Sequence, residues 1–150
     1  MRAVIQRVSE ASVTIDSKTA SEISNGLLIL LAVEAEDSII DADWLIGKII
    51  RMRIFGDDDN QMNLSVQDVH GELLVVSQFT LFSSTKKGNR PSFIKSAKPD
   101  IAIPIYEYFL KAIEAESMLK TKAGVFGADM QVKLVNNGPV TIIIDSKNKE

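Results

Sequence analysis

The chain has 150 residues, about the size of one compact domain, and its 45% apolar and 25% charged residues are typical of a globular protein. It has no cysteine and a single histidine, which excludes disulfide scaffolds, thiol nucleophiles, thiolate zinc sites and multi-histidine metal sites. A formal net charge of −3 argues against a general polyanion binder, although it is compatible with a local basic patch. We expect one domain over residues 1–150 with no metal, and a polar tail over 146–150 that is a candidate for disorder.

The sequence gives no sign of a membrane segment. Its longest apolar run, residues 26–33, is far shorter than the roughly 20 residues that cross a bilayer. The amino terminus passes directly into strand-like residues and lacks the apolar region of a signal peptide. We therefore expect a cytoplasmic protein with no membrane partner.

The first third of the chain predicts strands followed by a helix. Residues 4–8 and 11–15 are strand-like with a bulge at 9–10, and residues 16–18 supply the turn of an opening hairpin. Residues 27–33 are continuously apolar, as in a central strand buried on both faces. Apolar residues at helical spacing then predict a helix from about 38 to 51.

The middle of the chain contains an acidic cluster at residues 57–60, which invites comparison with a calcium-binding loop. Such a loop needs glycine at its sixth position and glutamate at its twelfth, where this chain has Met62 and Asp68. We therefore predict a solvated hairpin turn. A long strand over 72–82 and a polar loop over 83–91 follow.

The last third predicts a second helix and two more strands. The helix should end near Ser117 and tolerate Pro99 and Pro104 in its first turn, with a core stripe of Ile105, Tyr108, Phe109, Ala112 and Ile113. Strands are expected at 131–135 and 140–145, joined by a turn at 136–139. The overall pattern is α/β: a single layered domain of mixed β-sheet with two main α-helices.

Polar residues interrupt the apolar strand at Ser77, Gln78, Phe79 and Thr80. One interpretation is a strand end that leaves the core. The other is a pocket wall, in which Ser77 or Thr80 orients a water or a substrate and backbone N–H groups stabilise an oxyanion. A strand would place Ser77 and Phe79 on one face and Gln78 and Thr80 on the other.

Two further segments have both a structural and a functional interpretation. Gly138-Pro139 can be interpreted as an ordinary turn with a trans peptide bond, or as a rigid backbone element that approaches a ligand closely. The non-periodic stretch 123–130 contains Phe126, Gly127 and Met130, which pack in the core or stack on a flat ring.

Positive charge gathers in a segment without acids. Residues 73–99 contain five cations, Lys86, Lys87, Arg90, Lys95 and Lys98. They form a solvated loop or a phosphate-binding patch. The one histidine, His70, lies in a predicted turn and is expected to be an exposed spectator.

Five segments in this order resemble the D-aminoacyl-tRNA deacylase family: 1–8, 77–82, 89–93, 124–130 and 137–141. The resemblance spans nearly the whole chain, and each segment alone would be weak. Phe82 stands where the family commonly has tyrosine, and Ala123 where it commonly has threonine. Neither change removes a group that we assign to the chemistry, so both affect local hydrogen bonding only.

The resemblance implies an esterase that removes D-amino acids, and also mischarged glycine, from tRNA, as a homodimer without a cofactor. It implies that Ser77, Gln78, Phe79 and Thr80 frame the scissile ester, and that Phe126, Gly127 and Met130 receive the terminal adenine. It also implies a cis Gly138-Pro139 element that reaches into the partner's active site and excludes L side chains, propped across the interface by Arg7. Contacts with tRNA phosphates are expected from Lys86, Lys87 and Arg90.

Without a cysteine, a credible triad or a metal cluster, hydrolysis must depend on positioning and oxyanion stabilisation. We favour attack by water, with help from the ribose 2′-OH, while a nucleophilic Thr80 stays open although no general base is evident beside it. Two other functions fit the same residues. One is a non-catalytic RNA-binding module, and the other is an esterase or amidase for free D-amino acid derivatives.

Overall fold

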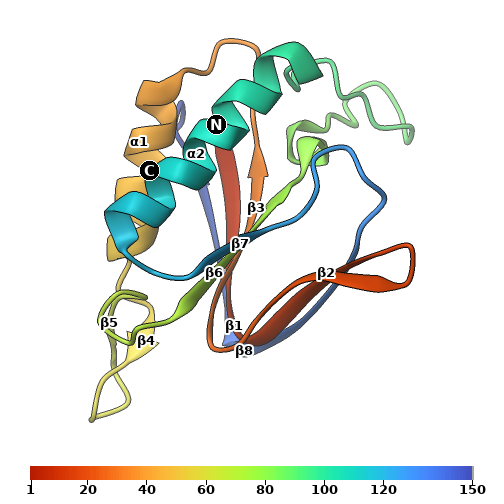
Figure 1. The fold of residues 1–150 in the computed structure, drawn as a ribbon. Coiled ribbons are helices and arrows are strands. Elements are labelled where there is room, and N and C mark those ends of the chain that lie inside the picture. Colours follow the sequence, from red (N-terminus) through yellow and green to blue (C-terminus); the bar gives the residue numbers. More distant parts are fainter. Residues whose placement is uncertain (150) are drawn as a thin grey trace.

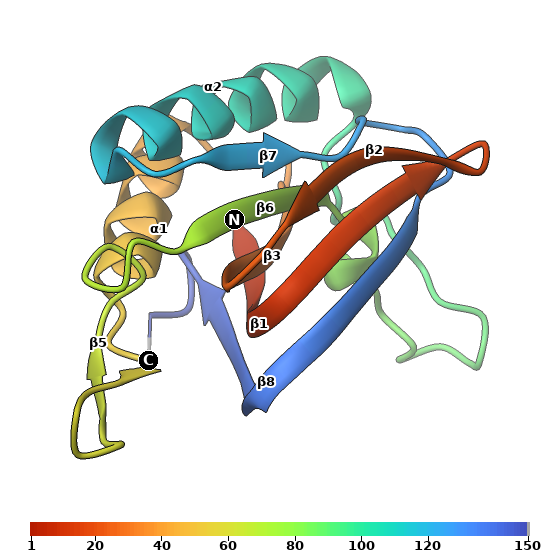
Figure 2. The same cartoon turned by 60° about the horizontal axis from the view of Figure 1, so that its bottom comes forward.

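The computed structural model describes residues 1–149, and two helices lie together on one face of a curved sheet (Figures 1 and 2). The helices are α1 (Ile39–Arg51) and α2 (Pro99–Ser117), and a short 3₁₀ helix, η1, spans Phe79–Phe82. The strands are β1 (Arg2–Ile15), β2 (Lys18–Ile23), β3 (Gly26–Ala32), β4 (Phe55–Gly56), β5 (Met62–Leu64), β6 (Glu72–Ser77), β7 (Thr121–Ala123) and β8 (Gln131–Asp145). This arrangement confirms the predicted α/β class.

Strand β1 organises the sheet because it pairs antiparallel with β2, β3 and β8. Figure 2 shows β8 running beside β1, with Arg2 opposite Asp145 at one end and Thr14 opposite Gln131 at the other. Strands β3 and β6 are parallel, as are β6 and β7, so the sheet is mixed. The carboxyl ends of β3 and β6 therefore lie at the same edge, where Leu31 pairs with Ser77.

The main core lies between the sheet and the two helices. In α1 the buried residues include Ala42, Leu45, Ile46, Ile49 and Ile50, the stripe that the helical spacing predicts. In α2 the buried stripe is Ala102, Tyr106, Phe109 and Ile113. The prediction for α2 was therefore partly wrong: Ile105, Tyr108 and Ala112 are only partly buried at its flank.

The position of Pro104 is a second difference between the predicted and the observed helix α2. Pro99 is the first helical residue, as predicted, but Pro104 lies inside the helix, beyond the first turn. Its missing N–H removes the bond that would otherwise run to the carbonyl of Asp100 near the helix start.

Two predicted turns are confirmed. Asp16 and Ser17, both with positive φ, connect β1 to β2 as the opening hairpin. The acidic cluster is the turn between β4 and β5, where the Asp57 carboxylate accepts hydrogen bonds from the N–H groups of Asp59 and Gln61. A side chain that is already used in this way shapes the turn.

The predicted strand 72–82 is wrong beyond Ser77. The N–H of Gln78 donates to the carbonyl of Leu31 at 2.8 Å, and the chain then turns into η1, whose first bond runs from Leu81 N to Gln78 O at 3.2 Å. The alternation of faces expected for residues 77–82 does not apply, because a 3₁₀ helix turns its side chains about three residues per turn.

The predicted turn at 136–139 is also wrong, because β8 continues through it. Its register with β1 passes from Asn136 opposite Val8 to Thr141 opposite Gln6, so residues 137–140 bulge out opposite the single residue Arg7. The Asn136 side chain closes this bulge, since its Oδ1 accepts from Val140 N–H at 2.9 Å and its amide donates to the Val140 carbonyl at 3.2 Å. Polar turn residues thus produce a bulge in a paired strand.

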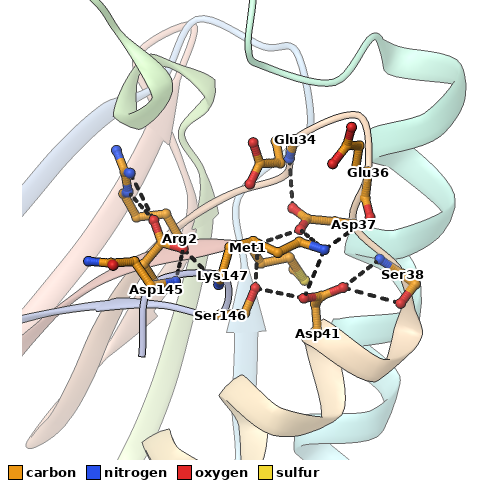
Figure 3. A network of polar contacts seen from close by, with 11 residues as sticks. Met1, Arg2, Glu34, Glu36, Asp37, Ser38, Asp41, Asp145, Ser146 and Lys147 are labelled. Atoms are coloured by element: carbon orange, nitrogen blue, oxygen red, sulfur yellow. Dashed lines mark hydrogen bonds and ion pairs between the residues drawn. The ribbon is translucent and has the colours of Figure 1, made fainter. Parts of the chain in front are cut away.

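The two ends of the chain meet in a buried polar network (Figure 3). The α-ammonium of Met1 lies 2.5 Å from Asp37 Oδ1 and 2.7 Å from Ser146 Oγ. The Ser146 hydroxyl donates to Asp41 at 2.8 Å. Burial alone would raise the pKa of Asp41, but hydrogen bonds from Ser146 and Ser38 and the charge of Lys147 lower it to about 2.

This network includes the first residues of the expected polar tail. Ser146 is only 4% exposed, and Lys147 lies 3.5 Å from Asp41 Oδ1. The last residue of the expected tail, position 150, lies outside the described residues. Over residues 1–149, no helix combines the length and the apolar character that a membrane crossing requires.

Candidate functional site

A cavity of about 270 Å³ opens at the edge where β3 and β6 end, between η1, α2 and the loop after β7. Strand ends supply one wall, helix α2 the floor, and the loop and the start of β8 the other wall. The lining residues are Leu31, Ala32, Val33, Val76, Ser77, Gln78, Phe79, Ala97, Ala102, Tyr106, Phe126, Gly127, Ala128, Met130 and Val132. The structure thus brings Ser77, Gln78 and Phe79 together with Phe126, Gly127 and Met130.

The polar wall of the cavity is the end of β6 and the start of η1. Ser77 and Gln78 are held by sheet pairing with β3, so their backbone position is fixed by the core. Thr80 does not line the cavity, but its hydroxyl accepts a hydrogen bond from the Gln78 amide at 2.5 Å. The Thr80 hydroxyl keeps its own proton available for a further acceptor.

Backbone donors are available at the start of η1. Because the first 3₁₀ bond comes from Leu81 N–H, the N–H groups of Phe79 and Thr80 precede the ladder and have no carbonyl partner within η1. The carbonyl of Phe79 accepts from Ser96 Oγ at 2.7 Å, and its exposed ring meets Phe93 edge to face at 5.2 Å. These contacts from the loop before α2 hold the segment at the cavity mouth.

The same cavity has an aromatic wall. The rings of Phe126 and Tyr106 lie 5.7 Å apart, and Tyr106 donates from its buried hydroxyl to the Val75 carbonyl at 3.0 Å. Met130 completes the wall because Gly124 leaves room for it: a Cβ at Gly124 would lie 2.5 Å from the Met130 sulfur. The wall is apolar and includes two aromatic rings inclined at 59°, which suits contact with another aromatic ring.

The sequence reasoning missed Tyr106, Ala102 and the β3 residues of this lining. Ala102, Tyr106, Phe109 and Ile113 also recur at helical spacing. They form a stripe that shares Phe109 and Ile113 with the predicted one but is rotated slightly around the helix. That alternative phase of α2 was the signal that could have found Tyr106.

The cavity is nearly free of ionisable groups. Tyr106 is its one ionisable lining residue, and burial raises its pKa to about 12, so it is neutral in ordinary buffers. His70 lies in an exposed turn outside the lining, as predicted. Residues 1–149 contain no group of three or more His, Cys, Asp and Glu side chains placed to hold a metal ion. The site offers hydroxyl, amide and backbone N–H groups but no general base.

Gly138 and Pro139 lie outside this cavity. Their peptide bond is cis, and both residues are exposed at the bulge of β8. Arg7 contacts the bulge directly. The Arg7 Nε donates to the Asn137 carbonyl at 3.0 Å, and a Cβ added at Gly138 would lie 2.8 Å from the Arg7 Nη2. Arg7 thus supports the element within one chain, where the sequence analysis expected a contact across an interface.

The three side chains expected to contact tRNA phosphates also lie outside the cavity lining. Lys86, Lys87 and Arg90 are exposed on a loop whose base is closed by two hydrogen bonds of 2.9 Å between the backbones of Ser84 and Ser92. Within residues 1–149, none of the three cations forms an ion pair. Their charge is therefore not neutralised by a neighbouring carboxylate.

Comparisons with known proteins agree with each other. A family model described as D-Tyr-tRNA(Tyr) deacylase matches residues 4–145. The D-aminoacyl-tRNA deacylases of Flavobacterium johnsoniae and Bacteroides fragilis are 61% and 57% identical to the chain over 150 residues, which is 100% of each sequence. A solved c-Myc DNA unwinding element binding protein has a TM-score of 0.91 at 38% identity, covering 97% of this chain and 98% of its own. A probable eukaryotic D-amino acid tRNA deacylase, at 16% identity and a TM-score of 0.84 over 95% and 97% of the two chains, shares the fold.

Proposed function

The chain belongs to the D-Tyr-tRNA(Tyr) deacylase family, and from this premise we propose that it hydrolyses the ester joining a D-amino acid to the 3′-terminal adenosine of tRNA. The observation that carries the proposal is that one cavity is lined both by the polar end of β6 and by Phe126 and Met130. In this proposal residues 1–150 act as one deacylase domain in the cytoplasm, where the enzyme removes wrongly charged amino acids before they reach translation.

The chemistry follows from what the cavity contains. An aminoacyl ester is already activated, so a water molecule attacks its carbonyl carbon while the backbone N–H groups of Phe79 and Thr80 donate to the oxygen that becomes negative. The tetrahedral intermediate then expels the ribose oxygen, which receives the proton that the attacking water loses, relayed through the neighbouring 2′-OH or through solvent. A single hydrogen-bond donor to the oxyanion raises the rate by a factor on the order of 10²–10³. This contribution does not depend on an ionisable base.

Thr80 has a supporting role in this scheme. Its hydroxyl is held by the Gln78 amide and lies next to the proposed oxyanion donors. No base stands ready to activate it as a nucleophile, so we assign it to orienting the water or the ester. If Thr80→Ala keeps near-normal turnover, Thr80 is not a nucleophile and assistance by the 2′-OH gains support.

The aromatic wall is the proposed site for the terminal adenine. A flat base stacks favourably on an aromatic or thioether surface without needing a specific hydrogen bond. Phe126 and Met130 offer such a surface, and Gly127 with its positive φ turns the loop beside it. In this proposal the ribose ester lies toward Ser77 and Phe79 on the other wall of the cavity.

Selection against L-amino acids is assigned to Gly138-Pro139 of a second copy in a homodimer. The element is exposed, it contacts no substrate cavity of its own chain, and the same strand exposes Val135 and the 68% exposed Ile143 on either side of it. A rigid backbone wall rejects a side chain of the wrong hand by collision, which exceeds the ~1–3 kcal/mol available from hydrophobic preference. Glycine, which has no side chain, passes such a wall, so glycyl-tRNA is also a proposed substrate.

The basic loop is assigned to the tRNA phosphates. Lys86, Lys87 and Arg90 are exposed and unneutralised, which suits contacts with a phosphate backbone. Reversing all three charges should weaken tRNA affinity in a salt-dependent way, whereas reversing the exposed Lys111 on α2 should leave it unchanged. An esterase for free D-amino acid derivatives would be insensitive to both changes.

The decisive experiment compares hydrolysis of D-tyrosyl-tRNA and L-tyrosyl-tRNA, with and without a chelator. Rapid loss of the D ester alone, unaffected by chelator, supports the proposal. If tRNA binds while both esters stay intact, the chain is an RNA-binding module, and the roles given to Thr80 and Gly138-Pro139 are wrong.

A further inference from the structure

The guanidinium of Arg2 joins β1, β8 and η1, the short helix whose first residue, Phe79, lines the cavity. Its Nε and Nη2 donate to Oδ2 of Asp145 at 3.0 and 2.8 Å, and its Nη1 donates to the carbonyl of Leu81 in η1 at 2.8 Å. The same group lies 4.8 Å from the centre of the Phe82 ring. Figure 3 shows Arg2 and Asp145 reaching toward each other from the ends of β1 and β8.

The segment that Arg2 contacts needs an external restraint. Helix η1 has only four residues, and the hydrogen bonds at its two ends run from Leu81 N to Gln78 O and from Ser83 N to Thr80 O. A 3₁₀ helix of this length is not stable by itself. Leu81 and Phe82 form its second half, and the proposed oxyanion donors Phe79 and Thr80 form its first half.

The geometry suits arginine and no other cation. The planar guanidinium donates to the carboxylate along one edge and to the Leu81 carbonyl from another nitrogen, while its face covers the Phe82 ring. The carboxylate is itself fixed, because Asp145 is the strand partner of Arg2 and accepts backbone hydrogen bonds from Lys147 and Asn148. The strand pair β1–β8 therefore holds the second half of η1, while Ser96 and Leu31 hold its start.

We propose that Arg2 and Asp145 are positioning residues for the hydrolysis, which hold η1 so that the N–H groups of Phe79 and Thr80 stay in place at the cavity. This inference rests on the proposed deacylase function. It predicts an effect on turnover and not on substrate binding, because neither residue lines the cavity. It also predicts little effect on stability: Arg2 is 35% exposed, and at the 14% exposed Asp145 asparagine can still accept the backbone hydrogen bonds of Lys147 and Asn148.

The test uses the full chain with Arg2→Lys, Asp145→Asn and the double variant. Lysine keeps the positive charge but cannot donate hydrogen bonds to the carboxylate and to the Leu81 carbonyl at the same time. Asparagine keeps the shape of Asp145 without its charge. We expect each single change to lower kcat for D-tyrosyl-tRNA roughly ten- to a hundredfold, as a small misplacement of a reacting group does. KM should stay within about twofold, and the double variant should be no slower than the slower single variant, because both act through η1.

Two controls separate a positioning role from a structural one. Arg51→Lys and Glu116→Gln alter an ion pair of similar length, 2.9 Å, between α1 and α2, and should leave kcat unchanged. Thermal unfolding and light scattering of every variant show whether the fold and the oligomeric state are kept.

The outcomes are distinct. If the wild-type protein fails to hydrolyse D-tyrosyl-tRNA, the proposed function itself is wrong. If it does so and the variants match it, or lose kcat only together with stability or assembly, the positioning role is overturned. A fall in kcat with unchanged KM, melting temperature and oligomeric state supports the inference.

Discussion

Replacing Asp37 by asparagine should strongly destabilise the fold, because it leaves a buried charge without its counterion. The α-ammonium of Met1 and the Asp37 carboxylate are 2.5 Å apart, and both side chains are 0% exposed. Asparagine has nearly the same shape and can still accept the hydrogen bond that Asp37 Oδ2 receives from the Glu34 N–H at 2.7 Å. Its single carbonyl oxygen cannot also accept from the Met1 ammonium, so the change removes the negative charge and that hydrogen bond, together with the 3.9 Å contact between Asp37 Oδ1 and Lys147 Nζ.

The magnitude follows from the burial of the pair. Removing one partner of a buried ion pair costs about 3–5 kcal/mol, since the remaining charge has been taken from water without compensation. In a chain of this size each kcal/mol lowers the melting temperature by about 2–4 °C, so the expected decrease is roughly 6–20 °C. Ser146 Oγ still accepts from the ammonium, which favours the lower half of this range.

The assay is thermal unfolding followed by circular dichroism, at one protein concentration because assembly shifts the midpoint. Glu116→Gln is the matched control: it removes the charge partner of Arg51 in a pair whose side chains are 65% and 44% exposed, and should change stability by about 0–1 kcal/mol. If Asp37→Asn melts within about 2 °C of the wild type, the buried ammonium does not depend on Asp37 and the reasoning fails.

Three further results are expected. The pKa of Asp41 is lowered from 3.8 to about 2 in the folded state, so its contribution to the free energy of unfolding is complete above about pH 4 and is lost as the pH falls toward 2. Asp41→Asn should therefore be less stable than the wild type at neutral pH. Its free energy of unfolding, measured by urea titration, should fall less between about pH 4 and pH 2 than that of the wild type. Tyr106→Phe removes one of two hydrogen bonds to the Val75 carbonyl, which still accepts from the Gly124 N–H at 2.9 Å, and should cost about 0.5–1.5 kcal/mol in urea unfolding, while KM changes little because the ring stays in place. Gly26→Ala would place a Cβ 1.9 Å from the Glu72 carbonyl in the β3–β6 pairing and should cost more than ~3 kcal/mol or yield insoluble protein; a variant as soluble and stable as the wild type would contradict that contact.

Local patterns predicted the elements whose structure is decided locally. The apolar spacing of α1 and the continuous apolar run of β3 identified both elements to within one or two residues. Residues 72–82 were misjudged because the apolar pattern continues to Phe82, whereas the sheet pairing that would extend the strand ends when Gln78 bonds to Leu31. No sequence pattern shows where a neighbouring strand ends.

The same limit explains the errors at the carboxyl-terminal end. Asn136, Gly138 and Pro139 are typical turn residues, yet β8 continues because β1 pairs with it on both sides of the bulge. Ser146 was assigned to a polar tail because nothing near it in the sequence reveals that the Met1 ammonium lies beside it in space. The membership of Ser77, Gln78 and Phe79 in one site with Phe126 and Met130 was implied by the family resemblance, while Tyr106 required the structure.

The pairing of β1 with β8 also has a consequence for biosynthesis. A ribosome makes β1 first and β8 more than a hundred residues later, so β1 waits through most of synthesis with one edge unpaired. During that time the edge can join another nascent chain, and pairings this distant in sequence form slowly. The cavity wall at Met130 and the Gly138-Pro139 bulge are added only at this late stage. A chaperone that covers β1 until β8 has left the ribosome should therefore raise the yield of folded protein more than one that acts after release.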